Sequence, residues 1–182
     1  TQKDTPGYSG RKEDSLRWVA KKKYLSKGLE EIISQIDSYM EKGEIIKDEE
    51  GHKIIRINIK EDIFVIKKYK IKGSWHYLRK LFSQTRAFVA WKASHWFNAA
   101  GIRTINIVAV IEKYNFLSTT DSYLISLNQP EERLDKVDLN KQQGYLIENR
   151  LSSFFKRLEW IGFNHGDAKS ANFFLGNNNL IV

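Results

Sequence analysis

The sequence predicts a mixed α+β fold, and two kinds of pattern lead to that prediction. Between residues 43 and 69, isoleucines alternate with polar residues in runs broken near residues 49–51 and 60–62. Alternation with a period of two is typical of strands with one buried face, so this stretch predicts three antiparallel strands. Residues 83–100 and 146–158 instead predict helices, the second of them strongly amphipathic.

The remaining elements follow from the same reasoning. Apolar residues recur at helical spacing from Leu29 to Met40, and Gly43 offers a stop, so an amphipathic helix is predicted there. Residues 105–112 and 122–127 predict two further strands. Residues 1–12 are polar and contain Pro6, Gly7 and Gly10, so little order is predicted at that end.

These elements group into three regions. Residues 1–42 are predicted to be an N-terminal extension with an amphipathic helix. Residues 43–128 form a lobe with an antiparallel sheet and a helix, and residues 129–182 begin a second, largely helical lobe. The polar stretch at 128–144 is the expected boundary between the lobes.

Composition limits the classes of function. Thirty Lys and Arg against 22 Asp and Glu give a net charge of +8, which favours an anionic partner such as a nucleotide, acidic lipid headgroups or nucleic acid. The chain has no cysteine, which excludes disulfides and thiolate zinc sites. Its apolar runs are too short to span a bilayer, and its N-terminus lacks the apolar core of a signal peptide. We therefore expect a soluble protein on the cytoplasmic side.

One basic cluster has two interpretations. Lys21, Lys22 and Lys23 lie between Trp18 and Tyr24. Aromatic and basic side chains together can rest on an anionic membrane surface. The alternative is a solvated face with no partner, which is the more frequent origin of such clusters.

A polar loop after the second amphipathic helix contains the most informative motif. Residues 164–175 read Asn-His-Gly-Asp-Ala-Lys-Ser-Ala-Asn-Phe-Phe-Leu, with Asp167, a Lys two residues later and an Asn five residues later. This is the spacing of a kinase catalytic loop between a helix and a strand. Asp167 could orient and deprotonate an attacking hydroxyl, Lys169 could neutralise the moving phosphoryl group, and Asn172 could bind Mg²⁺. The alternative is an ordinary polar turn.

The third predicted strand ends in a candidate for contacting the phosphates of ATP. Lys67 and Lys68 are adjacent and therefore face opposite sides of the strand, so only one can reach the nucleotide. A loop over the phosphates would fall at residues 48–53, where Gly51 is the single glycine and backbone amides could contact phosphate. Residues 83–100 contain no acid. The lysine's usual glutamate partner must come from another element, or the nucleotide alone holds the lysine.

The sequence from about residue 44 to 182 resembles the lipopolysaccharide kinase family, which acts on Kdo or heptose of the inner core. Residues 65–76, with their Trp75-His76 continuation, residues 85–112 and residues 164–175 carry the resemblance. It implies a bilobal protein-kinase-like fold with a partial helical second lobe. It also implies the cofactors ATP and Mg²⁺, and an acceptor sugar in a lipopolysaccharide precursor (lipid A with core glycan).

The resemblance also bears on location and on single residues. It implies a position at the inner face of the cytoplasmic membrane, peripheral to an anionic surface. It favours Lys67 over Lys68 as the nucleotide lysine, and Trp75, His76 and Arg86 become candidates for acceptor or phosphate contact. Because the sequence ends at Val182, where a strand leading to a second metal-binding Asp should begin, the second lobe is expected to be truncated and the full protein to continue with that Asp.

Other functions remain open at this stage. A small protein kinase or an aminoglycoside-type kinase would share the His-Gly-Asp motif, although Trp75-His76 argues against both. A pseudokinase that binds nucleotide or lipid headgroups without transfer would explain the missing acidic residues. A nucleic-acid binder fits the charge alone, but no recognised DNA- or RNA-binding motif is present, so no nucleic acid partner is expected.

Overall fold

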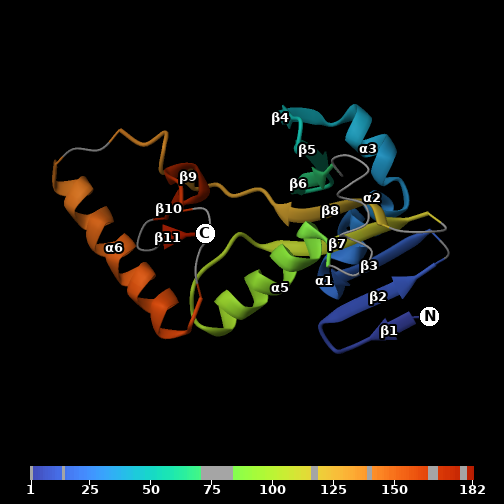
Figure 1. Ribbon diagram of the computed structural model, residues 1–182. Helices are drawn as coiled ribbons and strands as arrows, with labels where there is room; N and C mark the ends of the chain where they lie inside the picture. Colours follow the sequence, from blue (N-terminus) through green and yellow to red (C-terminus); the bar gives the residue numbers. More distant parts are fainter. Residues whose placement is uncertain are drawn as a thin grey trace. The chain divides into compact units, whose positions relative to one another are not determined.

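A computed structural model describes residues 2–13, 15–70, 84–115, 119–138, 141–163, 168–176 and 180–182. The chain forms two compact units, shown with their elements in Figure 1. The first comprises residues 1–93 and 106–128, and the second comprises residues 94–105 and 129–182. Helices and strands both occur, which confirms the predicted mixed α and β structure.

The first unit is built on a large antiparallel sheet. Among the described residues this sheet has eight strands in the order β1-β2-β3-β7-β8-β6-β5-β4. Their bounds are β1 (Gln2–Asp4), β2 (Tyr8–Lys12), β3 (Leu16–Lys21), β4 (Glu44–Glu49), β5 (His52–Ile59), β6 (Asp62–Tyr69), β7 (Ile107–Tyr114) and β8 (Thr119–Leu127). β4, β5 and β6 confirm the three strands predicted from the isoleucine alternation, and β7 and β8 confirm the two later ones.

The N-terminal segment supplies three of these strands, so the prediction of little order at residues 1–12 was wrong. β1, β2 and β3 pair in succession, and β3 then pairs with β7, from Leu16 opposite Lys113 to Ala20 opposite Ala109. The strands are held by pairing with a segment far along the chain. Local composition, which was polar and contained glycine, gave no sign of that partner.

The aromatic residues of the basic cluster are buried, which corrects the membrane-contact interpretation of this segment. Trp18 and Tyr24 are each only 6% exposed. Lys21 Nζ donates to Asn106 Oδ1 at 2.8 Å, and Asn106 Nδ2 donates to the Tyr24 hydroxyl at 3.0 Å. Burial lowers the pKa of Lys21, and the charge of Lys23 lowers it further. The two rings belong to the core and cannot insert into a membrane surface.

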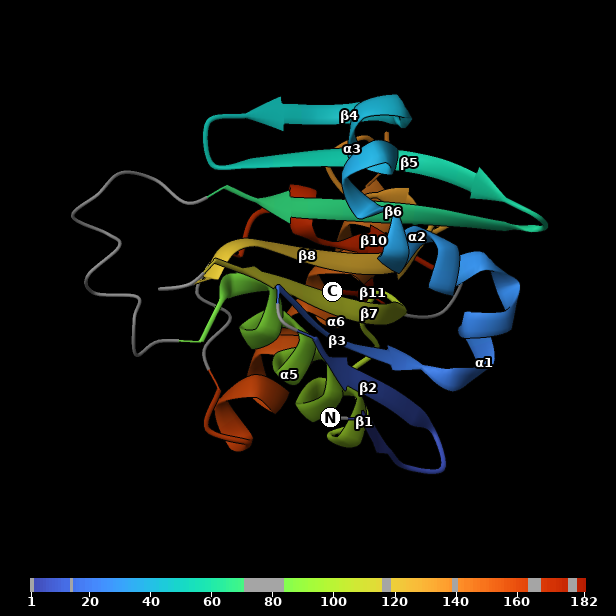
Figure 2. The same cartoon turned by 90° about the vertical axis from the view of Figure 1, so that its right-hand side faces the viewer.

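Short helices cover one face of the sheet. α1 (Lys22–Tyr24) leads through an irregular helical turn into α2 (Glu30–Ser34) and α3 (Ile36–Lys42), as Figure 2 shows. They confirm the helix predicted between Leu29 and Gly43, with a break at Gln35. The helices and the sheet bury a shared core. It includes Leu29, Ile32, Ile33, Ile36, Met40, Ile55, Ile57, Phe64, Ile66, Tyr123 and Ile125.

Gly28 makes the entry into α2 possible. Its φ is 102°, in the left-handed region that favours glycine. A Cβ at this position would also collide with the side chain of Ile59 on β5. The close approach of this turn to the sheet therefore needs a residue without a side chain.

The opposite face of the sheet carries the start of α5 (Arg86–Ala99). Arg17 alternates with the buried Trp18 on β3 and so points away from the core. Its guanidinium lies 5.4 Å from the ring centroid of Phe88 on α5, and the rings of Tyr8 and Trp91 meet edge to face at 5.9 Å. Each face of the sheet therefore has its own helical partner.

The second unit has a smaller core of its own. It contains α6 (Lys141–Trp160) and a sheet with the order β11-β10-β9, formed by β9 (Glu132–Arg133), β10 (Phe174–Leu175) and β11 (Leu180–Ile181). Phe154 of α6 packs edge to face on Phe173 with ring centroids 5.5 Å apart. α6 and β10 confirm the helix and the strand that were predicted on either side of the predicted catalytic loop. No helix in the described ranges is long and apolar enough to cross a membrane.

The burial of Trp18 predicts that the N-terminal strands contribute to stability. We expect Trp18→Ala to lower the free energy of unfolding by about 3–5 kcal/mol, because it removes a large buried ring from the core. Urea denaturation would measure this loss. Glu13→Ala, in the exposed β2–β3 turn, is the control and should change stability by less than about 0.5 kcal/mol. Equal stability of the two variants would show that this segment is not part of the cooperative unit.

Candidate functional site

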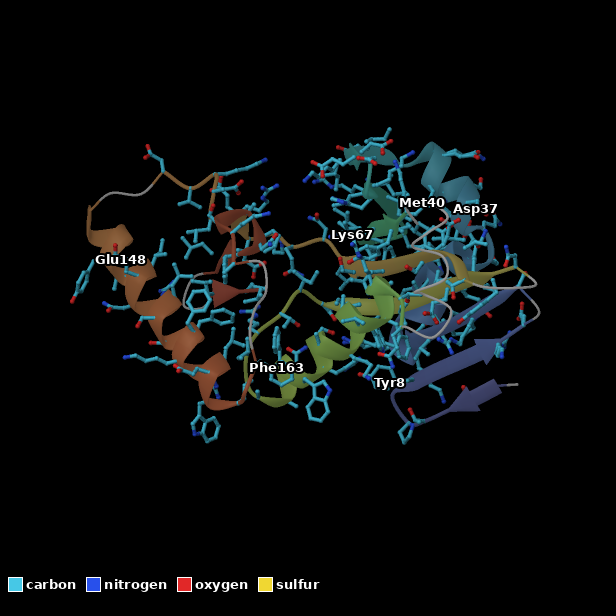
Figure 3. The ribbon with its side chains drawn as sticks, viewed as in Figure 1. Tyr8, Asp37, Met40, Lys67, Glu148 and Phe163 are labelled. Carbon is cyan, nitrogen blue, oxygen red and sulfur yellow. The ribbon has the colours of Figure 1, made fainter. Side chains whose placement is uncertain are left out.

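Lys67 and Lys68 lie on opposite faces of the sheet, as the strand alternation predicted. Lys68 is on the side covered by α3, where its Nζ is 3.2 Å from Asp121 Oδ2 and 5.4 Å from the ring centroid of Tyr123. It shares a hollow with Asp37 and Met40 of α3, labelled in Figure 3. Lys68 is therefore occupied by a structural ion pair beneath a helix.

Lys67 lies on the other face, the one where α5 begins. Its neighbours across the sheet are Ile54 of β5 and Leu124 of β8. Its Nζ lies 5.1 Å from the ring centroid of Tyr69, two residues further along the same strand. Burial raises the pKa of Tyr69, and the nearby charge of Arg86 opposes that shift. Lys67 thus lies near the ring of Tyr69, and the charge of Arg86 affects the hydroxyl of the same residue.

Gly51 lies in a tight turn next to the strand that carries Lys67. Glu49 and His52 are paired, so only two residues connect β4 to β5. Lys70, just after β6, holds this turn: its backbone N–H donates to Gly51 O at 3.1 Å, and its Nζ donates to Asp48 Oδ1 at 2.6 Å. The turn is therefore attached to the end of β6. The role of Gly51 in phosphate binding stays a prediction.

His52 is a residue of this face that the sequence did not single out. It pairs with Tyr69 across β5 and β6, while Ile54 pairs with Lys67, so His52 and Lys67 point to the same side. Desolvation and then the charge of Lys67 lower the pKa of His52 below its usual 6.5, while Glu49 opposes the shift. His52 is consequently neutral at neutral pH, and its pKa depends on the charge of Lys67.

Glu112 of β7 is a buried carboxylate on the same face, and sequence reasoning did not assign it a role. It is 2% exposed and accepts hydrogen bonds from Arg17, from Thr85 Oγ1 at 2.6 Å and from Tyr114 Oη at 3.0 Å. Thr85 Oγ1 also accepts from the backbone N–H of Phe88 in the first turn of α5. The sequence feature that could have indicated this cluster is Glu112 itself, a single acidic residue that directly follows the apolar residues 107–111.

The second unit carries the described part of the predicted catalytic loop. Lys169 and Asn172 are joined by a short 3₁₀ turn, Ser170–Asn172, in which the Asn172 N–H donates to Lys169 O at 2.8 Å. Phe173 follows and is buried against α6, which fixes the end of the loop. The structure therefore brings Lys169 and Asn172 together, whereas Lys67 and Gly51 belong to the first unit.

Several predicted site residues lie outside the described residues. These are Asp167, the predicted proton acceptor, and Trp75 and His76, the candidate acceptor contacts. Asn172 offers an amide oxygen, a ligand type that Mg²⁺ accepts. Across the described ranges, no group of three or more His, Cys, Asp or Glu side chains is arranged to hold a metal ion. Asn172 is thus the described residue on which the magnesium prediction rests.

Comparison with known proteins finds a similar fold among solved structures. No protein-family model matches the sequence, and no curated protein matches it significantly. A solved structure of WaaP in complex with acyl carrier protein has a similar fold, with a TM-score of 0.62 at 15% sequence identity. The match covers 91% of this chain and 69% of that one. The chain therefore has a WaaP-like fold, and the acyl carrier protein is a partner of WaaP in that structure.

The position of His52 beside Lys67 leads to a prediction about its pKa. We expect its pKa, followed by NMR titration of the imidazole, to lie below 6.5 and to rise in Lys67→Ala, because removing that cation favours protonation. Lys68→Ala is the matched control, since Lys68 lies on the opposite face. An equal rise in both variants would contradict the assignment of faces.

The cluster around Glu112 makes a second prediction. Glu112→Gln should lower the free energy of unfolding by about 1–3 kcal/mol, because a buried network loses its acceptor charge and one acceptor oxygen. Urea denaturation measures the loss, and faster amide hydrogen exchange in the first turn of α5 should accompany it. Asp121→Asn removes a partly exposed ion pair and should cost about 0–1 kcal/mol. Unchanged exchange in α5 would show that Glu112 does not anchor this helix.

Proposed function

We propose that this protein is an ATP-dependent phosphotransferase that phosphorylates a sugar hydroxyl, of Kdo or heptose, in the lipopolysaccharide inner core. The observation that carries the proposal is the fold, which is similar to that of WaaP, a lipopolysaccharide-core kinase, over 91% of this chain. It agrees with the sequence resemblance, which rests on different features. The two together favour sugar phosphorylation over a general protein-kinase activity.

The arrangement of the first unit supports Lys67 as the nucleotide lysine. Lys68 is engaged by Asp121 under α3, whereas Lys67 lies on the α5 face with Arg86 and the β4–β5 turn nearby. In kinase folds the phosphate-binding lysine and the loop over the phosphates act together on the nucleotide. Lys67 and the backbone at Gly51 are the residues that we assign to these roles.

The chemistry then falls to the loop in the second unit. Asp167 orients the acceptor hydroxyl and takes its proton as the oxygen forms a bond to the γ-phosphorus and the bond to the leaving ADP breaks. Lys169 offsets charge on the transferred group, and Asn172 holds the metal. ATP supplies the phosphoryl group and Mg²⁺ neutralises its charge, which is the chemistry these cofactors contribute when bound.

The charge of the chain fits the acceptor class. Lipid A and the core glycan are polyanionic, and a net charge of +8 attracts such a substrate. The acceptor is anchored in lipid, so the protein works at the inner face of the cytoplasmic membrane, peripheral to its anionic surface. The buried Trp18 and Tyr24 have no part in that contact.

Asp167→Asn in the full protein tests the reaction. We expect transfer from labelled ATP to a lipopolysaccharide precursor to fall by at least about a hundredfold, with nucleotide binding nearly unchanged, because a general base contributes to catalysis and not to binding. A protein substrate offered in parallel tests acceptor class. Label in protein alone would replace the sugar acceptor with a protein. ATP binding without any transfer by the unmodified protein would identify a pseudokinase.

Lys67→Ala and Lys68→Ala form a matched pair for the nucleotide site. Lys67→Ala should weaken ATP binding about tenfold or more, because it removes a cation from the phosphates. Lys68→Ala should change ATP binding less than about twofold. Isothermal titration calorimetry gives both values, and the reverse order would move the nucleotide to the other face of the sheet.

A further inference from the structure

A hollow in the second unit is lined by residues to which no functional role has been assigned so far. Its volume is about 430 Å³, and it lies between the segment after α5, one side of α6, and β11. The residues that define its chemistry are Ile102, Arg103, Arg150, Phe154, Arg157 and Leu180. Of the predicted nucleotide and catalytic residues, those that the structure describes (Gly51, Lys67, Lys169 and Asn172) do not line it. The residues that line it are therefore different from these four.

Its three arginines reach the hollow for simple geometric reasons. Arg150 and Arg157 are seven residues apart on α6, which places them on the same side of the helix about two turns apart. Phe154, between them on that side, packs into the small core. Arg103 comes from the segment that faces this side of α6. Three guanidinium groups, which are permanently charged, thus surround a hollow that also has apolar lining residues.

The internal partners of these arginines are weak. Arg103 Nη2 is 3.6 Å from Glu131 Oε1, and Arg150 Nη1 is 3.4 Å from the carbonyl oxygen of Gly176. In the described part of the chain, Arg157 has no hydrogen bond or ion pair to another side chain. Among the described residues, no carboxylate lines the hollow. The guanidinium groups retain donors for an external acceptor.

The guanidinium of Arg157 lies close to Gly101. A Cβ on Gly101 would lie 2.8 Å from Arg157 Nη2, and Gly101 has a φ of 71°. The backbone conformation therefore favours glycine at this point, whereas an added Cβ would require only a shift of the flexible Arg157 side chain. The guanidinium rests directly against the backbone, close to the buried Ile102. The hollow is thus bordered by backbone and core residues, and not only by surface side chains.

We propose that this hollow binds a phosphate-bearing small molecule that also has an apolar part. Guanidinium groups hold phosphate oxygens through paired hydrogen bonds, and three of them match one or two phosphate groups. Ile102, Phe154 and Leu180 accommodate the apolar part of the ligand. The phosphate can come from a free metabolite or from a lipid headgroup, since both present the same group.

Calorimetric titration of the full protein with phenyl phosphate and with inorganic phosphate tests the proposal. Phenyl phosphate should bind more tightly, because its ring contacts the apolar floor. Arg150→Gln and Arg157→Gln should each weaken it about tenfold or more. Lys156→Gln, which removes an exposed cation next to Arg157 and outside the hollow, is the matched control and should change binding less than about twofold.

Two further measurements separate the hollow from the nucleotide site and distinguish the ligand sources. Lys67→Ala should leave phenyl phosphate binding unchanged, and the methyl resonances of Ile102 and Leu180 should shift on titration. Displacement by phosphatidylcholine vesicles containing phosphatidic acid would identify a lipid headgroup as a source, and its absence would restrict the site to soluble phosphates. No binding by the unmodified protein, or equal losses in Arg157→Gln and Lys156→Gln, would overturn the proposal.

Discussion

The buried carboxylate of Glu112 is the interaction on which the arrangement of the first unit depends. A buried charge is tolerated only when donors surround it, and here Arg17, Thr85 and Tyr114 provide them. Because Arg17 comes from β3 and Thr85 immediately precedes α5, one side chain joins the N-terminal strands, the centre of the sheet and the helix on its outer face. The same cluster keeps that helix beside the strand face that carries Lys67.

Because adjacent strand residues point to opposite faces of the sheet, the arrangement of the helices decides which of Lys67 and Lys68 is covered. The sequence established that Lys67 and Lys68 face opposite ways, but not which face is covered. That answer depends on where α2 and α3 pack, and the packing is decided by Gly28, by the buried isoleucines and by Asp37. Asp37 accepts from the Tyr123 hydroxyl at 2.9 Å and pairs with Lys113, which fixes α3 over Lys68. Lys67 is left on the α5 face.

The parts of the fold that the sequence predicted are those set by local periodicity. β4 to β8, α3, α5 and α6 all follow from runs of apolar residues at a period of two or at helical spacing. β1 to β3 were missed because their stability comes from pairing with β7 and from burying Trp18, neither of which local composition reveals. Glu112 was missed for a related reason, since one acid in an apolar strand does not disclose its three donors.

α6 contains two patterns, an apolar one and a basic one. Only the apolar pattern was recognised from the sequence. Its apolar spacing predicted an amphipathic helix, and Phe154 and Leu158 do pack into the core. Arg150 and Arg157 share a side with Phe154, but charged residues on a helix are normally interpreted as a solvated face. They line a hollow because the segment after α5 faces this side of α6 and β11 supplies Leu180. A charged stripe becomes a candidate binding site through tertiary neighbours that the helix itself does not specify.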